Sequence, residues 1–510
     1  MYDSSYNPYG AILIGEYFWG MEMNRLNALF IILLLMPVMA MSQVIRLSLS
    51  DVIRIAQESS PQAVQARGNF ESAQLSYKSY RAEYLPTLSL SSNPSLNHST
   101  SSVTLPDGTE KYVPSNSVHS NLNLDLSQNI WFTGGTISLS SSVSRLDQFG
   151  DSRTRNYYSQ PLQLSISQSL NGYNSFKWVR KTEPLSYRMA RKQYAETLEL
   201  VASQAAAYFF AMVSAQTDME IATLNYAAAD TLYTFGKGRY DIGTITEHEL
   251  LQLELRLLAE ETGIISAQTG LDDATDALRN FLNLPLQVEI QVVTDDSIPH
   301  FYVPADAALA LAEEHSPDID AMELSLVSSE SNLAYYRSQT GFRASIYMRL
   351  GLAQTASELP ESVRNLNDEQ AVSVSLSIPI LDWGRGRGRV KIAENNLELT
   401  KLRNEQSRVS FEKTVMRAVS QFNSQERQVD IARRTMQTAQ HRYEVAHHMY
   451  MTGNSTMLEL NEAITAKDSA YRGYISALSR YWQLYYTIRS MTGYDFEKDS
   501  TIEHEIENGL

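Results

Sequence analysis

Two glutamates at the start of a long helical pattern are the residues of this sequence whose types and spacing are best suited to chemistry. Glu459 and Glu462 lie three residues apart, which puts both carboxylates on one face of a helix. Glu459 also lies three residues after Thr456, and Thr-x-x-Glu at a helix start is a capping box that satisfies two backbone N–H groups. The pattern predicts a cap, an electrostatic role, or both for Glu459. Glu462 has no capping role.

The other clusters of titratable residues do not indicate catalysis. His441 and His448 are seven residues apart, too far to share a metal unless neighbouring chains contribute, so with His447 they predict a surface cluster. The Gly/Arg run 384–389 is typical of arginines that face water, headgroups or a pore, and is weak evidence for nucleic acid. The segment 236–238 lacks the preceding strand and the Lys-Ser/Thr ending of a phosphate loop. We therefore predict no enzyme, no catalytic residue, no metal and no cofactor.

Composition excludes several classes of protein. Of the 510 residues, 43% are hydrophobic, which rules out wholesale disorder. The formal net charge of −16 argues against a nucleic-acid partner, because affinity for phosphate backbones rests on Lys and Arg. The chain contains no Cys, so it has no disulfide, no thiolate metal site and no acceptor for an N-terminal lipid.

The N-terminal region has the pattern of an export signal. Positive charge at Arg25 precedes an apolar run over 26–38 and a small-residue cleavage site at 40–42, and we expect cleavage before Gln43. Residues 1–42 are thus interpreted as an upstream extension followed by a signal peptide. A retained anchor is the alternative, but the run falls short of the roughly 20 residues that span a bilayer. Elsewhere we expect no apolar run long enough for a transmembrane helix. If the mature protein is in a membrane, it must enter the membrane as strands.

The rest of the chain is an internal repeat. Placing Gly243 on Gly453 also aligns Thr246 with Thr456, at an offset of 210, whereas the segment 56–61 aligns with 312–317 at an offset of 256. The first half therefore carries 256 minus 210, or 46, extra residues. We expect a first structural repeat over 43–303, a second over 304–493, and an acidic tail over 494–510.

Each half combines strands with very long helices. We expect a helix over 50–83 with Ser50 as its N-cap, strands beginning near Thr87 and Gln160, and equivalent strands in the second half. Heptad seams predict a helix over 175–235 of roughly 90 Å and a return helix over 246–283. In the second half they predict another long helix, followed by a return helix over 456–492. A short strand is expected within 286–292. The tail after Gly493 has too little apolar content for a prediction.

The strands alternate aliphatic and polar residues with period 2. The pattern fits either a half-buried sheet in a soluble sandwich or a transmembrane barrel with lipid outside and water inside. Aromatic residues at the strand ends favour the barrel, since Trp and Tyr gather at membrane interfaces, and we select Trp131, Tyr173 and Trp383. Long polar connections, expected over 97–118, 148–159 and 353–369, also favour the barrel. The export signal decides for it.

Together these features resemble the TolC-like outer-membrane factors, the exit ducts of tripartite efflux pumps and type I secretion systems. The resemblance covers 50–493 and rests on the twofold repeat, the strand-to-helix junctions 377–384 and 166–178, and the paired glycine turns. It implies a mainly α protein with a transmembrane β-barrel, in which a homotrimer forms one strand barrel in the outer membrane and one long α-helical barrel through the periplasm. The implied partners are outer-membrane lipid, a periplasmic adaptor and an inner-membrane pump of RND or ABC type.

The resemblance also assigns roles to the two glycine turns. Glu459 and Glu462 fall where the family carries an acidic pair at the closed end of the pore, which implies acidic rings in a trimer. The residues implied to meet the adaptor are Ile242, Gly243, Thr244, Thr452, Gly453 and Asn454. Thr452 and Asn454 are more polar than the family pattern. Gln252 stands at the first-half equivalent of Glu462, so an acidic gate would belong to the second hairpin.

The leading hypothesis is a passive outer-membrane duct for small molecules; a type I protein secretion duct is the alternative. A periplasmic or surface coiled-coil adhesin is a distant one. Two strands per half give four per chain and twelve per trimer. We expect the additional hairpin, 119–131 with 135–147, to pack beside the barrel or extend it outside, because twelve helices must meet the same circumference.

Overall fold

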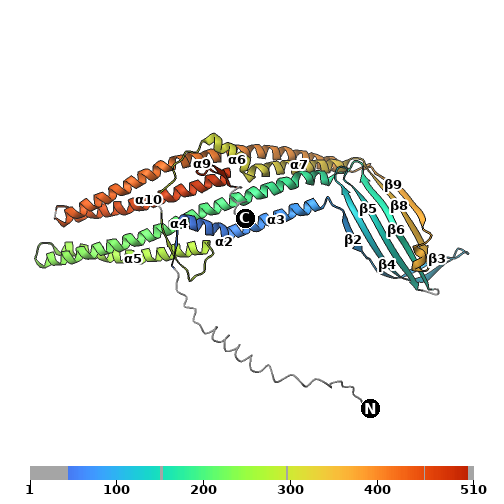
Figure 1. Ribbon diagram of the computed structural model, residues 1–510, viewed down its shortest axis with the longest axis horizontal. Coiled ribbons are helices and arrows are strands. Elements are labelled where there is room, and N and C mark those ends of the chain that lie inside the picture. The colour runs from blue at the N-terminus through green and yellow to red at the C-terminus, as the bar shows by residue number, and fades with distance from the viewer. Residues whose placement is uncertain (1–43, 150–152, 295–296, 453, 503–510) are drawn as a thin grey trace, which may run out of the picture.

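A computed structural model describes residues 44–149, 153–294, 297–452 and 454–502. The molecule is elongated, with a β-sheet at one end and the tips of two helical hairpins at the other (Figure 1). The predicted export segment 1–42 and the tip residue Gly453 lie outside the described residues.

The two halves of the chain repeat one order of elements, which confirms the predicted internal repeat. The first half contains β1 (Val44–Leu47), α2 (Leu49–Ser59), α3 (Pro61–Ala82), β2 (Thr87–Ser91), β3 (Ser95–Thr104), β4 (Glu110–Ile130), β5 (Gly135–Phe149), β6 (Thr154–Ser169), α4 (Ser175–Asp241), α5 (Glu247–Phe281) and β7 (Glu289–Val292). The second contains α6 (Ala305–His315), α7 (Pro317–Thr340), β8 (Arg343–Ala356), α8 (Leu359–Ser362), β9 (Asn367–Ser377), α9 (Arg385–Met451), α10 (Met457–Thr492), β10 (Tyr494–Asp495) and β11 (Ser500–Thr501).

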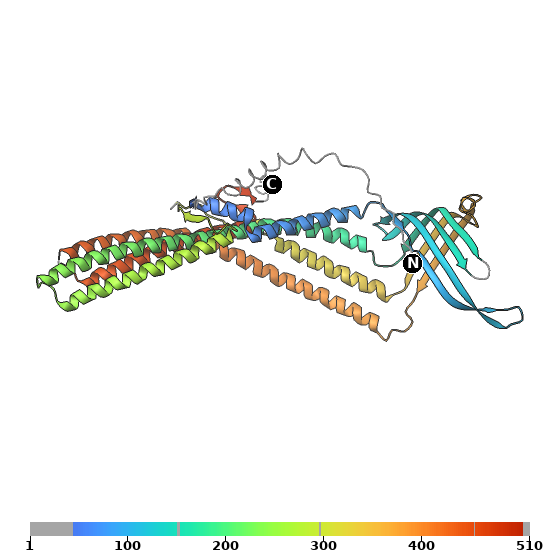
Figure 2. The same ribbon diagram turned by 90° about the horizontal axis from the view of Figure 1, so that it is seen from below.

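The helices α4 and α9 set the length of the molecule. Each has 67 residues, about 100 Å at 1.5 Å per residue. Each runs from the sheet to a tip and returns as α5 or α10 (Figures 1 and 2). Contrary to the expectation, α4 contains an 18-residue stretch long and apolar enough to cross a membrane. Over half of that stretch, 56%, is buried inside the molecule, because its apolar residues form the heptad seam of the helical bundle.

The first helix begins two residues earlier than expected. Ser48, and not Ser50, is the N-cap of α2, since the Asp51 backbone N–H donates to Ser48 Oγ and the Ser48 N–H donates to the Asp51 carboxylate. Ser48 is the N-cap because Asp51, three residues later, completes the reciprocal capping box. After a break at Ser60, α3 starts with Pro61, a position where the missing N–H costs nothing.

The strands at the end of the molecule form one seven-stranded antiparallel sheet. Its order is β2-β4-β5-β6-β8-β9, with β3 paired to the outer half of β4. The predicted strands near Thr87 and Gln160 are β2 and β6, and the sheet continues through β8 and β9 of the second half. The strands β2 and β9 end the ladder within the described chain.

Two expectations about this sheet are wrong. The extra hairpin does not pack beside the sheet: its strands β4 and β5 lie within it, hydrogen-bonded to β2 on one side and β6 on the other. The expected polar loop over 97–118 is mostly strand, because β3 pairs with β4 from Ser95–His119 to Thr104–Glu110. Insertion satisfies the backbone groups of both hairpin strands, whereas a separate hairpin would leave two unpaired edges.

The main hydrophobic core lies at the middle of the helices, where α2, α4, α5, α9 and α10 pack together. Phe209, Leu278, Phe422 and Tyr481 are at most 2% exposed there. The parallel pair β1–β7 covers this region, which confirms the short strand expected within 286–292.

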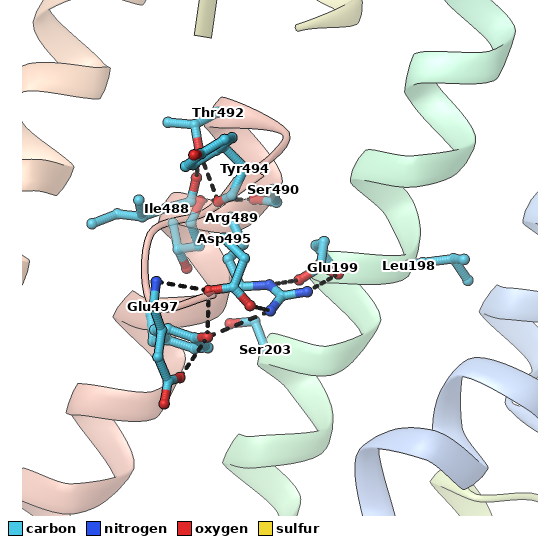
Figure 3. Close-up of polar contacts among 12 residues, drawn as sticks. Leu198, Glu199, Ser203, Ile488, Arg489, Ser490, Thr492, Tyr494, Asp495 and Glu497 are labelled. Atoms are coloured by element: carbon cyan, nitrogen blue, oxygen red, sulfur yellow. Dashed lines mark hydrogen bonds and ion pairs between the residues drawn. The ribbon is translucent and has the colours of Figure 1, made fainter. Parts of the chain in front are cut away.

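A buried ion-pair network fastens the C-terminal segment to this core (Figure 3). Arg489 of α10 donates from Nε and Nη2 to the two carboxylate oxygens of Glu199 in α4, at 2.8 and 3.1 Å. It also pairs with Asp495, whose other oxygen accepts from Tyr485 at 2.9 Å. The three charged side chains are 9%, 4% and 0% exposed. Charge pairing therefore holds the described part of the tail in place. The low apolar content of the tail, on which the sequence analysis relied, does not report such pairing.

Candidate pore-constriction site

Two turns at the same end of the molecule bring the predicted tip residues together. The first joins α4 to α5 through Ile242, the C-cap of α4, and Gly243. Gly243 has φ +72°, in the left-handed region, and a Cβ there would meet no atom within 4 Å. The backbone conformation, not crowding, therefore favours glycine at this position. The second turn joins α9 to α10 after the C-cap Thr452.

Both return helices begin with the predicted capping box. In α10 the Thr456 N–H donates to Glu459 Oε2 at 2.9 Å, and the Glu459 N–H donates to Thr456 Oγ1 at 3.3 Å. In α5 the corresponding distances between Thr246 and Glu249 are 2.8 and 3.3 Å. The repeat thus preserves the cap on both hairpins.

Capping also sets the electrostatics of Glu459. The Ser455 hydroxyl donates to its carboxylate at 2.6 Å, and this bond, followed by the Thr456 N–H, lowers the pKa of Glu459 below its usual 4.5. The pKa of Glu249 is lowered likewise, chiefly by the backbone of Thr246. The Glu459 carboxylate is ionised at neutral pH and is held against the helix end.

Glu462 is placed differently. Its side chain is 62% exposed, and its Oε2 lies 3.6 Å from Nη2 of Arg442 in α9, the other helix of the same hairpin. At the first-half equivalent, the Gln252 amide contacts the His248 ring at 3.1 Å. Sequence reasoning missed Arg442. It lies nearly as many residues before the turn as Glu462 lies after it, and in an antiparallel hairpin this spacing is the signal that could have identified it.

An apolar cluster holds the two tips together. Leu232 and Leu253 of the first hairpin pack with Leu460 and Ile464 of the second, all at most 6% exposed. A Cβ on Gly236 would lie 2.3 Å from Leu253 Cδ1. The glycine in the segment 236–238 therefore allows close helix packing.

Polar links further from the tips also join the hairpins, and no sequence pattern predicted them. Arg472 Nε of α10 donates to Asp218 Oδ1 of α4 at 2.6 Å. Asn225 Nδ2 of α4 donates to Asp468 Oδ2 of α10 at 2.9 Å. These contacts join residues more than 240 positions apart, so no local pattern records them.

The surface of the tips is mixed in character. Ile242 is 74% and Leu458 69% exposed, whereas the neighbouring Thr244, Thr452 and Asn454 are exposed and polar. Asn454 Nδ2 donates to Thr452 Oγ1 at 3.2 Å, which orders the second turn locally. Each tip therefore presents exposed apolar side chains amid polar ones.

The three selected aromatics all lie where strands meet helices, but they differ in environment. Trp383 is 90% and Trp131 43% exposed. The Arg180 guanidinium lies 4.2 Å from the centre of a Trp131 ring. Tyr173 is half-buried: its hydroxyl hydrogen-bonds Ser331 at 2.6 Å and its ring meets Tyr335 edge-on.

Across the described ranges, no three His, Asp or Glu side chains come together as a group that could hold a metal. Among the clustered histidines, His441 lies 3.7 Å from Glu444 and is 80% exposed. His447 lies beside the Tyr443 ring.

Comparison with known proteins agrees with this architecture. Residues 308–494 match the family model described as outer membrane efflux protein. The chain matches this model over its second half, from within α6 to Tyr494. It is 23% identical over 325 residues to the cation efflux system protein CusC of Escherichia coli O157:H7, a match that covers 62% of this chain and 67% of the relative. It is 21% identical over 315 residues to the probable outer membrane lipoprotein SilC of Salmonella typhimurium, with the same coverage.

Solved structures of outer membrane proteins share the fold of this chain. The Campylobacter jejuni outer membrane channel CmeC superimposes with a TM-score of 0.65 at 15% identity, covering 90% of this chain and 88% of that one. The outer membrane protein VceC of Vibrio cholerae gives 0.62 at 13% identity, covering 87% and 96%. These matches locate the protein in the cell outer membrane. Its relatives are channel proteins and not enzymes.

Proposed function

We propose that three copies of this chain form a passive outer-membrane duct of a tripartite efflux pump. One observation carries the proposal: the sheet has a row of leucines across one face from β2 to β8, is open at both edges within the described chain, and leads directly into helices about 100 Å long. A sheet with apolar residues on one face and polar residues on the other is stable in a membrane only when it closes into a barrel. Closure requires further strands, which a symmetric homotrimer supplies.

The tips supply the proposed constriction and docking surface. Threefold symmetry would gather Glu462 and Glu459 around the duct axis, so that the closed end carries acidic rings. A periplasmic adaptor would meet the turns at Ile242, Gly243 and Thr244 and at Thr452, Gly453 and Asn454. The exposed Ile242 supports this role, because large apolar side chains at a helical tip are typical anchors of a protein interface.

Small cations are the first cargo to test. The net charge of −16 favours cations over anions inside a duct, and the relatives named CusC are cation efflux system proteins. A duct selects by size and charge, so small organic molecules are compatible with the same architecture. The inner-membrane pump, of RND or ABC type, would choose among them.

The test is conductance of the purified protein. We expect detergent-dependent extraction, a trimer in solution, and discrete single-channel currents across a planar bilayer in KCl solution. Full solubility without detergent together with an absence of currents would reject the duct and favour an adhesin. A type I secretion duct is the second candidate. It would be favoured if cells that express the neighbouring pump genes exported a polypeptide and not ions or small molecules.

A further inference from the structure

The extra hairpin of the first half continues one row of leucines across the sheet. Residues directly opposite one another in an antiparallel ladder project from the same face. The register aligns, from β2 to β8, Leu88, Leu126, Leu139, Leu164 and Leu350. Each is between 37% and 64% exposed. The hairpin leucines 126 and 139 therefore lie at the same depth as those of the strands on either side.

The opposite face of the same strands is polar. The neighbouring row consists of Ser89, Asp125, Ser140, Gln163 and Gly351. A carboxylate and an amide on this face require water, and the leucines on the other face exclude it. The hairpin thus has the two faces of a barrel wall, like the strands that flank it.

The hairpin turn is fixed to the rim of the helices. Asn174, the N-cap of α4, donates to the Trp131 carbonyl at 3.1 Å, and Gln168 donates to the Thr133 carbonyl at 3.0 Å. The Arg180 guanidinium lies over the Trp131 ring. These contacts hold the register of β4 and β5 at the junction between sheet and helices.

Circumference supports the same placement. Four helices per chain, α3, α4, α7 and α9, join the sheet directly. Twelve helices about 9 Å apart need a circumference of about 110 Å. Strands about 4.8 Å apart and tilted by about 40° take about 6.3 Å each, so eighteen need about 110 Å and twelve only about 75 Å. Matching the helices therefore favours the hairpin inside the wall, the reverse of the sequence-based expectation.

We propose that this hairpin is part of the membrane wall and that three copies close an eighteen-stranded barrel, with six strands in the ladder of each chain. The proposal rests on the proposed trimeric duct. The edge strand β9 of one copy pairs with β2 of the next, and outer-membrane lipid covers the leucine face. Beside the β9 edge, Ile380 is 95% and Trp383 90% exposed in the single chain, as expected for a seam that a second copy covers.

Single cysteines test the placement, and the absence of native Cys makes the labelling site-specific. Leu139→Cys and Ser140→Cys probe the two faces of β5, and Leu164→Cys on β6 is the matched reference for a wall strand outside the hairpin. Each variant is labelled with bimane as a purified trimer and reconstituted in vesicles with or without dibrominated phosphatidylcholine, whose acyl bromines quench probes in contact with lipid.

We expect bimane on Leu139→Cys to be quenched to the same extent as on Leu164→Cys, and bimane on Ser140→Cys to be unaffected. Quenching at Leu164→Cys without quenching at Leu139→Cys would overturn the eighteen-stranded barrel and leave the duct standing. No quenching at either position would reject the membrane barrel itself. Cryo-electron microscopy of the trimer supplies a second measurement: eighteen wall strands support the inference, and twelve with the hairpin outside contradict it.

Discussion

Arg442 and Glu462 face one another across the second helical hairpin, with 3.6 Å between Nη2 and Oε2. Both side chains are more than half exposed, so the pair contributes less than about 1 kcal/mol to stability. Its importance is electrostatic. In a trimer each Glu462 of the proposed ring would be accompanied by the guanidinium of Arg442, and the field at the duct axis would depend on both.

Opposite changes in ion selectivity are therefore expected from the two partners. Glu462→Gln removes a negative charge per chain and leaves Arg442, so the preference for K⁺ over Cl⁻ should fall. Arg442→Gln should raise it. The measurement is the reversal potential across a planar bilayer with a KCl gradient. Glu398→Gln, which breaks the exposed pair with Lys401 elsewhere on α9, is the matched control. Unchanged potentials in both tip variants would locate the constriction elsewhere.

The caps predict a pH dependence of the tips. Since the pKa of Glu459 in the folded protein is lower than its usual 4.5, the cap stabilises the helix start above that pH and is lost as pH falls through the lowered value. Hydrogen exchange, corrected for intrinsic rates, should thus show less protection at the start of α10 below pH 4.5. Glu459→Gln should flatten this dependence. Glu462→Gln, which removes a neighbouring carboxylate without a cap, should preserve it.

More of the tips than of the sheet could be predicted from the sequence. The caps were predictable because Thr456 and Glu459 interact over three residues, and the heptad seams gave the long helices for the same local reason. The hairpin was misplaced because alternation assigns each residue of β4 to a face but carries no information on which strand pairs with which. Pairing of Leu126 with Leu88 and Leu139 depends on the whole sheet.

Long-range polar contacts were equally out of reach. Arg442 lies 20 positions from Glu462, and Arg489 lies 290 from Glu199. A charged residue within a heptad pattern is ordinarily a solvated one, so nothing local distinguishes the buried Arg489 from exposed arginines such as Arg434. Only the packing of α10 against α4 makes the difference.

The link between Asp218 and Arg472 predicts a role in keeping the hairpins together. Asp218→Asn and Arg472→Gln should each increase the open-to-closed ratio of the duct, by at most about fivefold, because a partly exposed ion pair contributes up to about 1 kcal/mol. Single-channel recording measures the ratio, and the double variant should add little to either single one if the residues act as a pair. Asp430→Asn breaks the pair with Arg434 within α9 and should have no effect. An equal rise in that control would contradict a specific link.

The Arg489 network predicts a large loss of stability from one substitution and its recovery from three. Arg489→Met removes the guanidinium from between the carboxylates of Glu199 and Asp495, which are 4% and 0% exposed. Removing one partner of a buried charge pair costs about 3–5 kcal/mol, whereas replacing the whole set with apolar residues is often neutral. We therefore expect Arg489→Met to lower the urea midpoint of unfolding strongly. The triple variant Arg489→Met, Glu199→Leu and Asp495→Leu should recover most of that decrease in the midpoint. Arg434→Met, on an exposed arginine, controls for the change of residue type. A single variant as stable as the natural chain would mean that the charges in Figure 3 are not held apart from water.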